Sequence, residues 1–216
     1  STRESKEEYF KEYLGGSGAA AKILYEEFDF QVDPFSADNP IIFMNGLLTG
    51  IGVPAAAKSS FVTKSPLTGI WAEATVGGHW GNQVKRCGYD GMIITGKSPK
   101  PVYLWIDDNE VSIRPASGLW GTVTFDTQQL IQDELGDQNI RVACIGPAGE
   151  NASRIASIVN ERQAAGRGGL GAVMGAKNLK AVAVRGSMQV PVHAQAEFQE
   201  VLTFMHSSIQ NSEPLS

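Results

Sequence analysis

Residues 77–97 read GGHWGNQVKRCGYDGMIITGK and residues 168–187 read GGLGAVMGAKNLKAVAVRGS, and the two stretches match once a single residue is dropped near Trp80. Each stretch predicts a Gly-Gly turn, then a short helix, and then an apolar β run that ends at glycine. A glycine turn at a helix start leaves backbone N–H groups open to a ligand. We therefore expect two similar glycine-lined helix starts in one molecule.

The match extends upstream of the two glycine turns. The segment NPIIFMNGLLTG, which begins at Asn39, corresponds to NIRVACIGPAGE, which begins at Asn139. We predict internal repeats that cover roughly residues 39–114 and 139–187. Two copies of a strand-helix-strand unit predict a body with pseudo-two-fold symmetry, which would suit a ligand that itself has two halves.

Length and composition limit the possible classes of protein. The 216 residues are enough for one large domain or two small ones, and 42% of them are apolar. The net charge is -5, and the sequence has no run rich in Lys or Arg that could bind along a nucleic-acid backbone. We therefore expect no nucleic-acid partner. Cys87 and Cys144 form no CxxC pair, which favours a reducing, cytoplasmic setting. Apolar stretches are strand-sized and the N-terminus is charged, so we expect neither membrane insertion nor secretion.

Local patterns predict helices near both ends of the chain and short strands between them. The spacing of apolar residues predicts helices over Glu4–Leu14 and over Ser17–Phe28, with the first residue of the second as its N-cap. Another helix is predicted to have its N-cap at Thr124 or Asp126 and to end at Gly136. The predicted strands are residues 41–44, 59–63, 70–75, 92–95, 102–106, 111–114, 140–145, 153–159 and 181–186. Residues 102–114 form a predicted hairpin.

The glycine-rich stretch AAGRGGLGAVMGAK at residues 164–177 is the densest functional signal. It satisfies GxGxxG through Gly166, Gly168 and Gly171, but the dinucleotide fingerprint needs a strand that runs directly into the first glycine and a later acidic residue. Here NERQAA separates the predicted strand from the glycines, and Arg185 stands near the acidic position, so we exclude that fingerprint. Two interpretations stay open: a phosphate seat, or glycines that permit close helix–sheet packing.

The matching loop TVGGHWG at residues 75–81 favours the phosphate seat, because a second glycine turn occurs at the equivalent position. His79 and Trp80 could stack on a bound ring or hydrogen-bond to it, although a core position explains them at least as well. The histidines have no metal-ligand spacing with Cys, Asp or Glu, so we predict no metal site built from side chains. The pattern predicts a chain that holds a phosphorylated group and has no catalytic residue of its own.

Four motifs resemble one known family. They are SPLTG from Ser65, GYDGMIITGKSPKPVYLWI from Gly88, IGPAGEN from Ile145 and AAGRGGLGAVMGAKNLKAVAV from Ala164. In this order they resemble the N-terminal domain of the aldehyde ferredoxin oxidoreductases, which are tungsten or molybdenum bis-pterin enzymes. The similarity covers nearly the whole chain.

The resemblance implies an α+β fold of duplicated β3-α-β3 repeats, which form a pseudo-two-fold sheet platform with flanking helices. Residues 1–190 would be the bis-pterin cofactor-binding N-terminal domain, and residues 191–216 the truncated start of a linker or of the next, helical domain. On the platform of the family, two pterins ligate one tungsten or molybdenum, and a magnesium ion bridges their phosphates.

The resemblance also assigns contacts residue by residue. The implied pterin and phosphate contacts are Lys58, Thr75, Gly77, Gly78, Gln163, Ala164, Gly166 and Arg167. Magnesium would take the backbone carbonyls of Thr75 and Ala164, so side-chain identity is less restricted there. The family often has arginine at position 58 and asparagine at position 75. Around Arg162 and Gln163 this chain is one residue shorter than some relatives, so either residue could face the cofactor.

The implied function is the oxidation of an aldehyde to a carboxylic acid, with ferredoxin or another redox subunit as electron acceptor. The iron–sulfur cluster of the family is ligated in a continuation beyond this domain, and neither Cys87 nor Cys144 has the spacing to ligate it. We therefore expect part of an oxidoreductase, inactive in isolation, whose partners are its own downstream domains, with a homo-oligomer also compatible. The alternative is a non-catalytic phosphate- or nucleotide-binding module.

Overall fold

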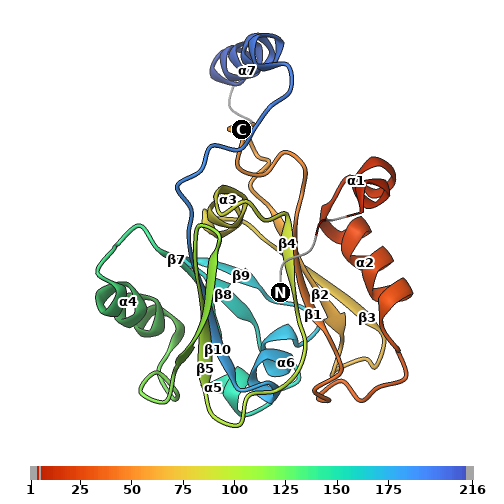
Figure 1. The fold of residues 1–216 in the computed structure, drawn as a ribbon, viewed down its shortest axis with the longest axis vertical. Coiled ribbons are helices and arrows are strands. Elements are labelled where there is room, and N and C mark those ends of the chain that lie inside the picture. The colour runs from red at the N-terminus through yellow and green to blue at the C-terminus, as the bar shows by residue number, and fades with distance from the viewer. Residues whose placement is uncertain (1–3, 5, 213–216) are drawn as a thin grey trace.

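The computed structural model describes residue 4 and residues 6–212. Within these residues the protein has a mixed α+β fold with two β-sheets and seven helices (Figure 1). A four-stranded sheet has the order β3-β2-β1-β4, and a six-stranded sheet has the order β6-β5-β10-β7-β8-β9. The predicted fold class is confirmed at this level.

The two repeats build equivalent antiparallel units. The first contains β1 (Ile41–Asn45), β2 (Ser59–Lys64), β3 (Trp71–Val76), α3 (Trp80–Arg86) and β4 (Gly91–Ile94). The second contains β7 (Arg141–Cys144), β8 (Ile158–Asn160), β9 (Gln163–Ala165), α6 (Leu170–Ala176) and β10 (Leu179–Arg185). The strand order β3-β2-β1-β4 therefore corresponds to β9-β8-β7-β10, with one helix between the third and fourth strands of each unit.

The units differ beyond their last strand. The hairpin of β5 (Val102–Asp107) and β6 (Glu110–Pro115) follows β4 in sequence, but β5 pairs in parallel with β10 of the second sheet. In sequence order, the first repeat thus has three strands, one helix and three further strands. The second repeat has only one strand after its helix within the described residues. The predicted hairpin is confirmed, and it joins the first repeat to the sheet of the second.

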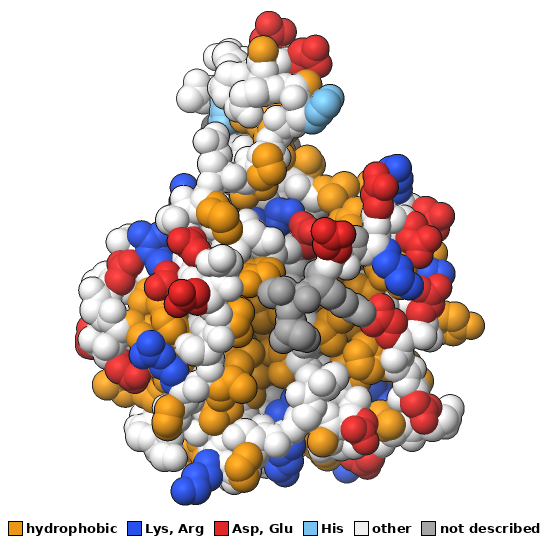
Figure 2. Space-filling view, viewed as in Figure 1, with side chains coloured by type: hydrophobic (Ala, Val, Ile, Leu, Met, Phe, Trp, Pro, Cys, Tyr) orange, Lys and Arg blue, Asp and Glu red, His pale blue; other side chains and the backbone are white. Residues whose placement is uncertain are grey.

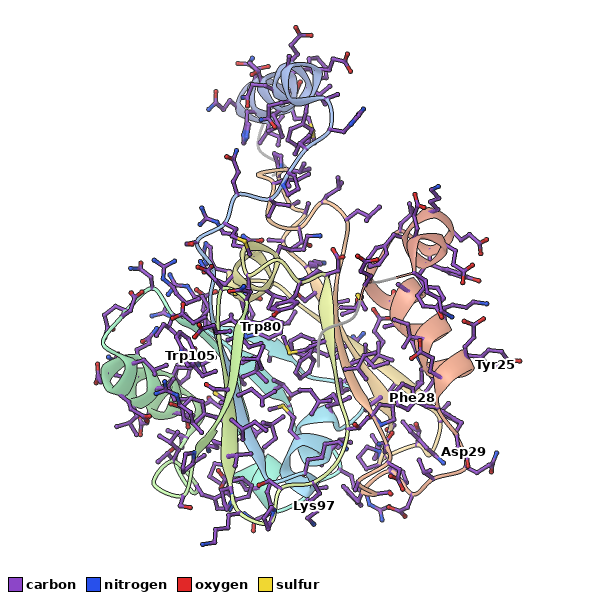
Figure 3. The ribbon with its side chains drawn as sticks, viewed as in Figure 1. Tyr25, Phe28, Asp29, Trp80, Lys97 and Trp105 are labelled. Atoms are coloured by element: carbon purple, nitrogen blue, oxygen red, sulfur yellow. The ribbon has the colours of Figure 1, made fainter. Side chains whose placement is uncertain are left out.

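The main core lies between the two sheets and includes both repeat helices. Helix α3 packs on β7 and β10 of the second sheet, and α6 packs on β1 and β2 of the first as well as on β10, so the units exchange helices across the core. Trp80, near the centre of Figure 3, is 1% exposed and donates from Nε1 to the carbonyl of Val182 at 3.0 Å. Its ring also packs on Phe43 and Phe61, so Trp80 is a core residue.

Helices cover the outer faces of both sheets. Helices α1 (Glu7–Tyr13) and α2 (Gly16–Glu27) pack on the first sheet, and α4 (Thr124–Leu135) packs on the second. The short α5 (Pro147–Glu150) packs on α6, and α7 (Gln195–Gln210) stands apart from the sheets (Figure 1). Residues 213–216 of the predicted segment 191–216 lie outside the described residues.

Several local predictions need correction. Helix α2 is capped by Gly15, one residue before it begins, and not by Ser17, because Gly15 bridges to Gly46 at the end of β1. The predicted strand at 153–159 shortens to β8, since a turn that follows α5 takes up its first residues. The N-cap of α4 is Val123, and neither Thr124 nor Asp126, because the helix already includes both of these residues. Helix α4 ends at Gly136 in the left-handed conformation, as predicted.

The visible surface mixes acidic and basic side chains around apolar patches (Figure 2). Among the residues that the structure describes, none of the helices combines the length and apolar character that a bilayer span requires.

Candidate functional site

The residues that the resemblance assigns to a cofactor form one group on each unit. The first unit contributes Lys58 before β2, Thr75 in β3, and Gly77 and Gly78 in the following turn. The second contributes Gln163 and Ala164 in β9, and Gly166 and Arg167 in its following turn. Strands β3 and β9 are sheet edges that contact each other, so the fold brings the two groups side by side.

Side-chain alternation directs both strands in the same way. In β3, Ala74 and Val76 are buried in the core between the sheets, while Thr75 is exposed. In β9, Ala165 is buried in the same core, while Ala164 is exposed. Successive residues of a strand face opposite sides. Thr75 and Ala164 therefore lie on the outward face of the junction of the two sheets.

The pairing register makes Thr75 and Ala164 equivalent. Residues paired across the strands follow the order Thr75, Ser60, Met44, Gly91 in the first unit and Ala164, Val159, Cys144, Ala181 in the second. Each series starts at the edge strand and ends at the strand after the helix. The two residues thus occupy the same position in two copies of one sheet.

The glycine turns of the two repeats differ in length by one residue, and this residue lies in the turn before α6. Helices α3 and α6 each have seven residues and begin at Trp80 and Leu170, both buried. The distance in sequence from Trp80 to Leu170 is one residue larger than the distance from Thr75 to Ala164. The turn before α6 is therefore one residue longer than the turn before α3. Gly78 (φ 87°) and Gly168 (φ 73°) are the matching left-handed glycines. Placing the gap at Trp80 was wrong, because buried residues and not the glycine pairs fix the alignment.

An additional strand, β9, precedes the glycines, so one reason for excluding a dinucleotide site was wrong. NERQAA does not separate strand from glycines, because β9 runs directly into Gly166. The topology of the sheet still excludes the dinucleotide-binding fingerprint. Strand β9 is antiparallel to β8, β8 to β7, and β7 to β10, so β9, α6 and β10 do not form the parallel β-α-β unit of that fold.

The glycines of the second turn serve close packing. A Cβ on Gly168 would lie 2.6 Å from Cβ of Ala72, and one on Gly169 would collide with the carbonyl of Arg154. In α6, a Cβ on Gly171 would lie 2.5 Å from the carbonyl oxygen of Ser157. These distances leave no room for a side chain, so this part of the motif is explained by helix and strand contacts.

Two glycines leave space on the outward face. The nearest atoms to a Cβ on Gly77 would be those of Gln163 at 4.0 Å, and the nearest to one on Gly166 would be Oγ of Ser157 at 3.7 Å. Lys58 and Arg167 are exposed, and neither has an ion-pair partner among the described residues. An accessible backbone flanked by unpaired cations can accept an anionic group.

The turn between β8 and β9 joins the two groups, and sequence reasoning missed it. Asn160 is buried and donates from Nδ2 to the carbonyl of Gly77 at 2.8 Å. Glu161 accepts from the backbone N–H of His79 at 2.8 Å. The only sequence signal was a short polar run between two apolar ones, which predicts a turn but no contact with another repeat.

Neither cysteine is positioned as a ligand. Cys87 lies in the core between the sheets and Cys144 in the core under α4. Burial raises the pKa of each thiol to about 12, which disfavours the thiolate needed for metal binding. Within residue 4 and residues 6–212, no three His, Cys, Asp or Glu side chains come together as a metal site.

Comparison with known proteins identifies the family. The model of the family described as "Aldehyde ferredoxin oxidoreductase, N-terminal domain" matches residues 1–186. The chain belongs to the aldehyde ferredoxin oxidoreductase family. The resemblance seen in the four motifs is therefore confirmed.

Relatives of this oxidoreductase family cover almost the whole chain. The tungsten-containing aldehyde ferredoxin oxidoreductase of Pyrococcus abyssi is 47% identical over 197 residues, which are 91% of this chain and 32% of that protein. The aliphatic sulfonate oxidoreductase, WOR-like subunit, of Pyrococcus furiosus is 35% identical over 92% of this chain and 34% of its own length. This chain thus spans about a third of the relatives that it matches.

A solved structure has the same fold. The active-site complex BamBC of benzoyl coenzyme A reductase, in complex with 1,5-dienoyl-CoA, aligns with a TM-score of 0.92 and 40% identity. The alignment covers 99% of this chain and 33% of that one. These relatives are all named as oxidoreductases or reductases, and they give no support to the alternative of a non-catalytic binding module.

Proposed function

We propose that residues 1–190 form the base on which a bis-pterin tungsten or molybdenum cofactor lies. The equivalence of Thr75 and Ala164 on two touching edge strands is the observation that carries this proposal. A pseudo-two-fold surface offers the same contacts twice. A cofactor with two matching halves would use both sets at once.

The exposed residues of the junction fit such a group. Lys58 and Arg167 would neutralise the two pterin phosphates. Gly77, Gly78 and Gly166 would present backbone N–H groups, with Gln163 between them. The carbonyls of Thr75 and Ala164 would hold a magnesium ion, because a hard cation prefers oxygen ligands, and the ion would help to neutralise the phosphates.

The bound metal would supply two-electron redox chemistry, and the residues of this chain would hold and orient its ligand. We assign no acid, base or nucleophile to them. The iron–sulfur cluster would be ligated by residues outside this chain, since both thiols here are buried and protonated at neutral pH.

The complete enzyme would oxidise aldehydes to carboxylic acids and pass the electrons to ferredoxin in the cytoplasm. Residues 191–216 would lead into the next domain, as the separation of α7 from the sheets supports. The names of relatives include a sulfonate oxidoreductase and a benzoyl coenzyme A reductase, so the substrate has to be decided by assay.

Metal and pterin analysis tests the proposal. The longer protein that contains this chain is expressed without oxygen in medium with tungstate and molybdate, and then purified. We expect two pterins and one tungsten or molybdenum per polypeptide, with reduction of ferredoxin when aldehyde is added. One pterin per metal, or no metal, would contradict a two-sided seat.

The isolated chain gives a second measurement. We expect the purified 216-residue protein to hold less than stoichiometric metal, because the pterins would be covered on one face only. Stoichiometric tungsten or molybdenum in this protein would show that expectation to be wrong.

A further inference from the structure

The turn between β8 and β9 belongs to the second unit but holds the first. Asn160 and Gln163 are paired across the hairpin, so Glu161 and Arg162 are its two turn residues. Glu161 has φ 52°, a left-handed conformation that glycine or asparagine adopts more readily. The backbone alone would thus favour another residue at this position. What glutamate adds is the reach of its carboxylate.

That carboxylate binds the glycine turn of the first unit. One oxygen accepts from the backbone N–H of His79 at 2.8 Å. The ring nitrogen Nδ1 of His79 lies 3.0 and 3.2 Å from the two oxygens, and Nε of Arg141 lies 3.3 Å from one of them. Hydrogen bonds to a carboxylate are stronger than those between neutral groups. Glu161 therefore holds both the backbone and the side chain at the end of the first turn.

The side chain of Gln128 fixes the main chain of Glu161. Its N–H donates to Oε1 of Gln128 at 2.8 Å, and its carbonyl accepts from Nε2 of the same side chain at 3.4 Å. Gln128 lies in α4, which packs on the second sheet. The carboxylate thus reaches the first unit from an anchored position in the second.

The neighbouring contacts act in the same direction. Asn160 donates to the carbonyl of Gly77, and a Cβ on Gly78 would meet Asn160 Nδ2 at 2.9 Å and collide with Glu161. The first turn is therefore in close contact with the hairpin. The same hairpin continues into Gln163 and Ala164. Any displacement of Glu161 would move one seat relative to the other.

We propose that Glu161 is a positioning residue that sets the spacing of the two halves of the seat. The proposal rests on the proposed function, because spacing matters only to a ligand that touches both halves. Glu161 itself acts through the turn at Gly77–His79 and through the strand that carries Ala164.

Amide hydrogen exchange of the 216-residue chain tests the contact itself. The variant Glu161→Gly removes the carboxylate but suits the left-handed backbone, so the hairpin should keep its stability. We expect the amide of His79 to exchange on the order of tenfold faster or more, since it loses a charge-assisted bond, while amides of β1 stay unchanged. Glu161→Gln keeps one acceptor oxygen and should restore most of the protection.

If Glu161→Gly does not fold, Glu161→Asn replaces it, because asparagine tolerates this backbone but is too short to reach His79. Unchanged exchange at His79 in a folded variant would overturn the proposal. So would equal acceleration across β1, which would indicate general destabilisation.

Binding of a probe then separates the two proposals. Pyrophosphate with magnesium is titrated into each variant and followed by phosphorus NMR. We expect weak binding to the wild type, a loss of at least about fivefold in Glu161→Gly, and recovery in Glu161→Gln. No binding to the wild type would count against the proposed seat, while the exchange result still decides whether Glu161 holds the turn. Equal binding to wild type and Glu161→Gly would overturn the positioning role.

Discussion

The turn before α3 and the turn before α6 occupy equivalent places in the two units, but different contacts hold them. The first turn, Gly77–His79, is held by polar side chains from the opposite unit, Asn160 and Glu161. The second turn also accepts a hydrogen bond from the opposite unit, since Oγ of Ser65 donates to the carbonyl of Gly168 at 2.8 Å. In addition, its backbone at Gly168 and Gly169 packs too closely on Ala72 and Arg154 to admit a side chain. One glycine pattern therefore meets two different structural requirements.

The difference shows why packing and ligand binding are not competing explanations of the glycines. Gly168 has no room for a Cβ, whereas Gly77 has open space beside Gln163. Close contact between backbones explains the former, and an accessible backbone explains the latter. We expect substitution of Gly168 to act mainly through stability, and substitution of Gly77 mainly through binding.

The largest effect should come from the buried ion pair of the second unit, Lys180–Glu150, whose side chains are 0% and 3% exposed. Asp90 occupies the position of Lys180 in the first unit and pairs with Lys85, and this pair is partly exposed, with 39% for Asp90 and 11% for Lys85. We expect Glu150→Gln to reduce the free energy of unfolding by about 3 kcal/mol or more, because a buried charge loses its partner.

The matched control is Asp90→Asn, which should reduce the free energy of unfolding by no more than about 1 kcal/mol. Urea unfolding of both variants measures the difference. Equal losses would mean that the two ion pairs contribute equally to stability despite their different burial.

The glycine turns give the next effect. Gly168→Ala places a Cβ against Ala72 and forces alanine into a left-handed backbone, so we expect a loss of about 3 kcal/mol. Gly77→Ala should cost less than about 1 kcal/mol, since its nearest neighbours would be 4.0 Å away. The same substitution should weaken binding of magnesium pyrophosphate. A larger loss of stability for Gly77→Ala than for Gly168→Ala would contradict the difference in packing between the two turns.

The helix C-caps of the two units should respond oppositely to pH. The caps are Cys87 after α3 and Lys177 after α6. Burial lowers the pKa of Lys177 from 10.5 to about 8 and raises that of Cys87 from 9.0 to about 12. Between pH 8 and 10.5 the unfolded chain binds more protons at Lys177 than the native one, so this lysine makes stability rise with pH. Above pH 9, the buried thiol makes stability fall as pH rises.

Between pH 8 and pH 9 the thiols, whose unfolded pKa is 9.0, already lower the free energy of unfolding as the pH rises. The difference in slope between wild type and Lys177→Met therefore measures the contribution of Lys177, because both proteins keep the two thiols. We expect wild type and Cys87→Ala to share a rise that Lys177→Met lacks. The same slope in all three proteins would exclude a shifted pKa at Lys177.

The smallest effect on stability should come from the exposed cations. Lys58→Met and Arg167→Met should each change the free energy of unfolding by no more than about 0.5 kcal/mol, because neither side chain has a charged partner in the described structure. In the longer protein, both should lower the content of bound pterin. Full pterin content in both variants would exclude them as phosphate contacts.

Several of these contrasts were accessible from the sequence and several were not. The hairpin at 102–114 and the end of α4 at Gly136 follow from local patterns, and the structure confirms them. The repeat also follows from local patterns, and its two copies correspond to two units of equivalent strand order. The N-cap of α2 and the length of β8 were missed, because contacts with Gly46 and the turn after α5 outweigh local preference there.

The sequence by itself determined that this chain has two copies of one unit, since apolar periodicity and glycine turns are local properties that repeat visibly. It also supplied the motifs that place the chain in its family. The tertiary structure alone decided which residues of the two copies correspond, because burial and strand register depend on pairing between distant segments. It decided, too, that Glu161 of one copy holds the turn of the other. A carboxylate and a backbone N–H that are 82 residues apart leave no pattern in the sequence.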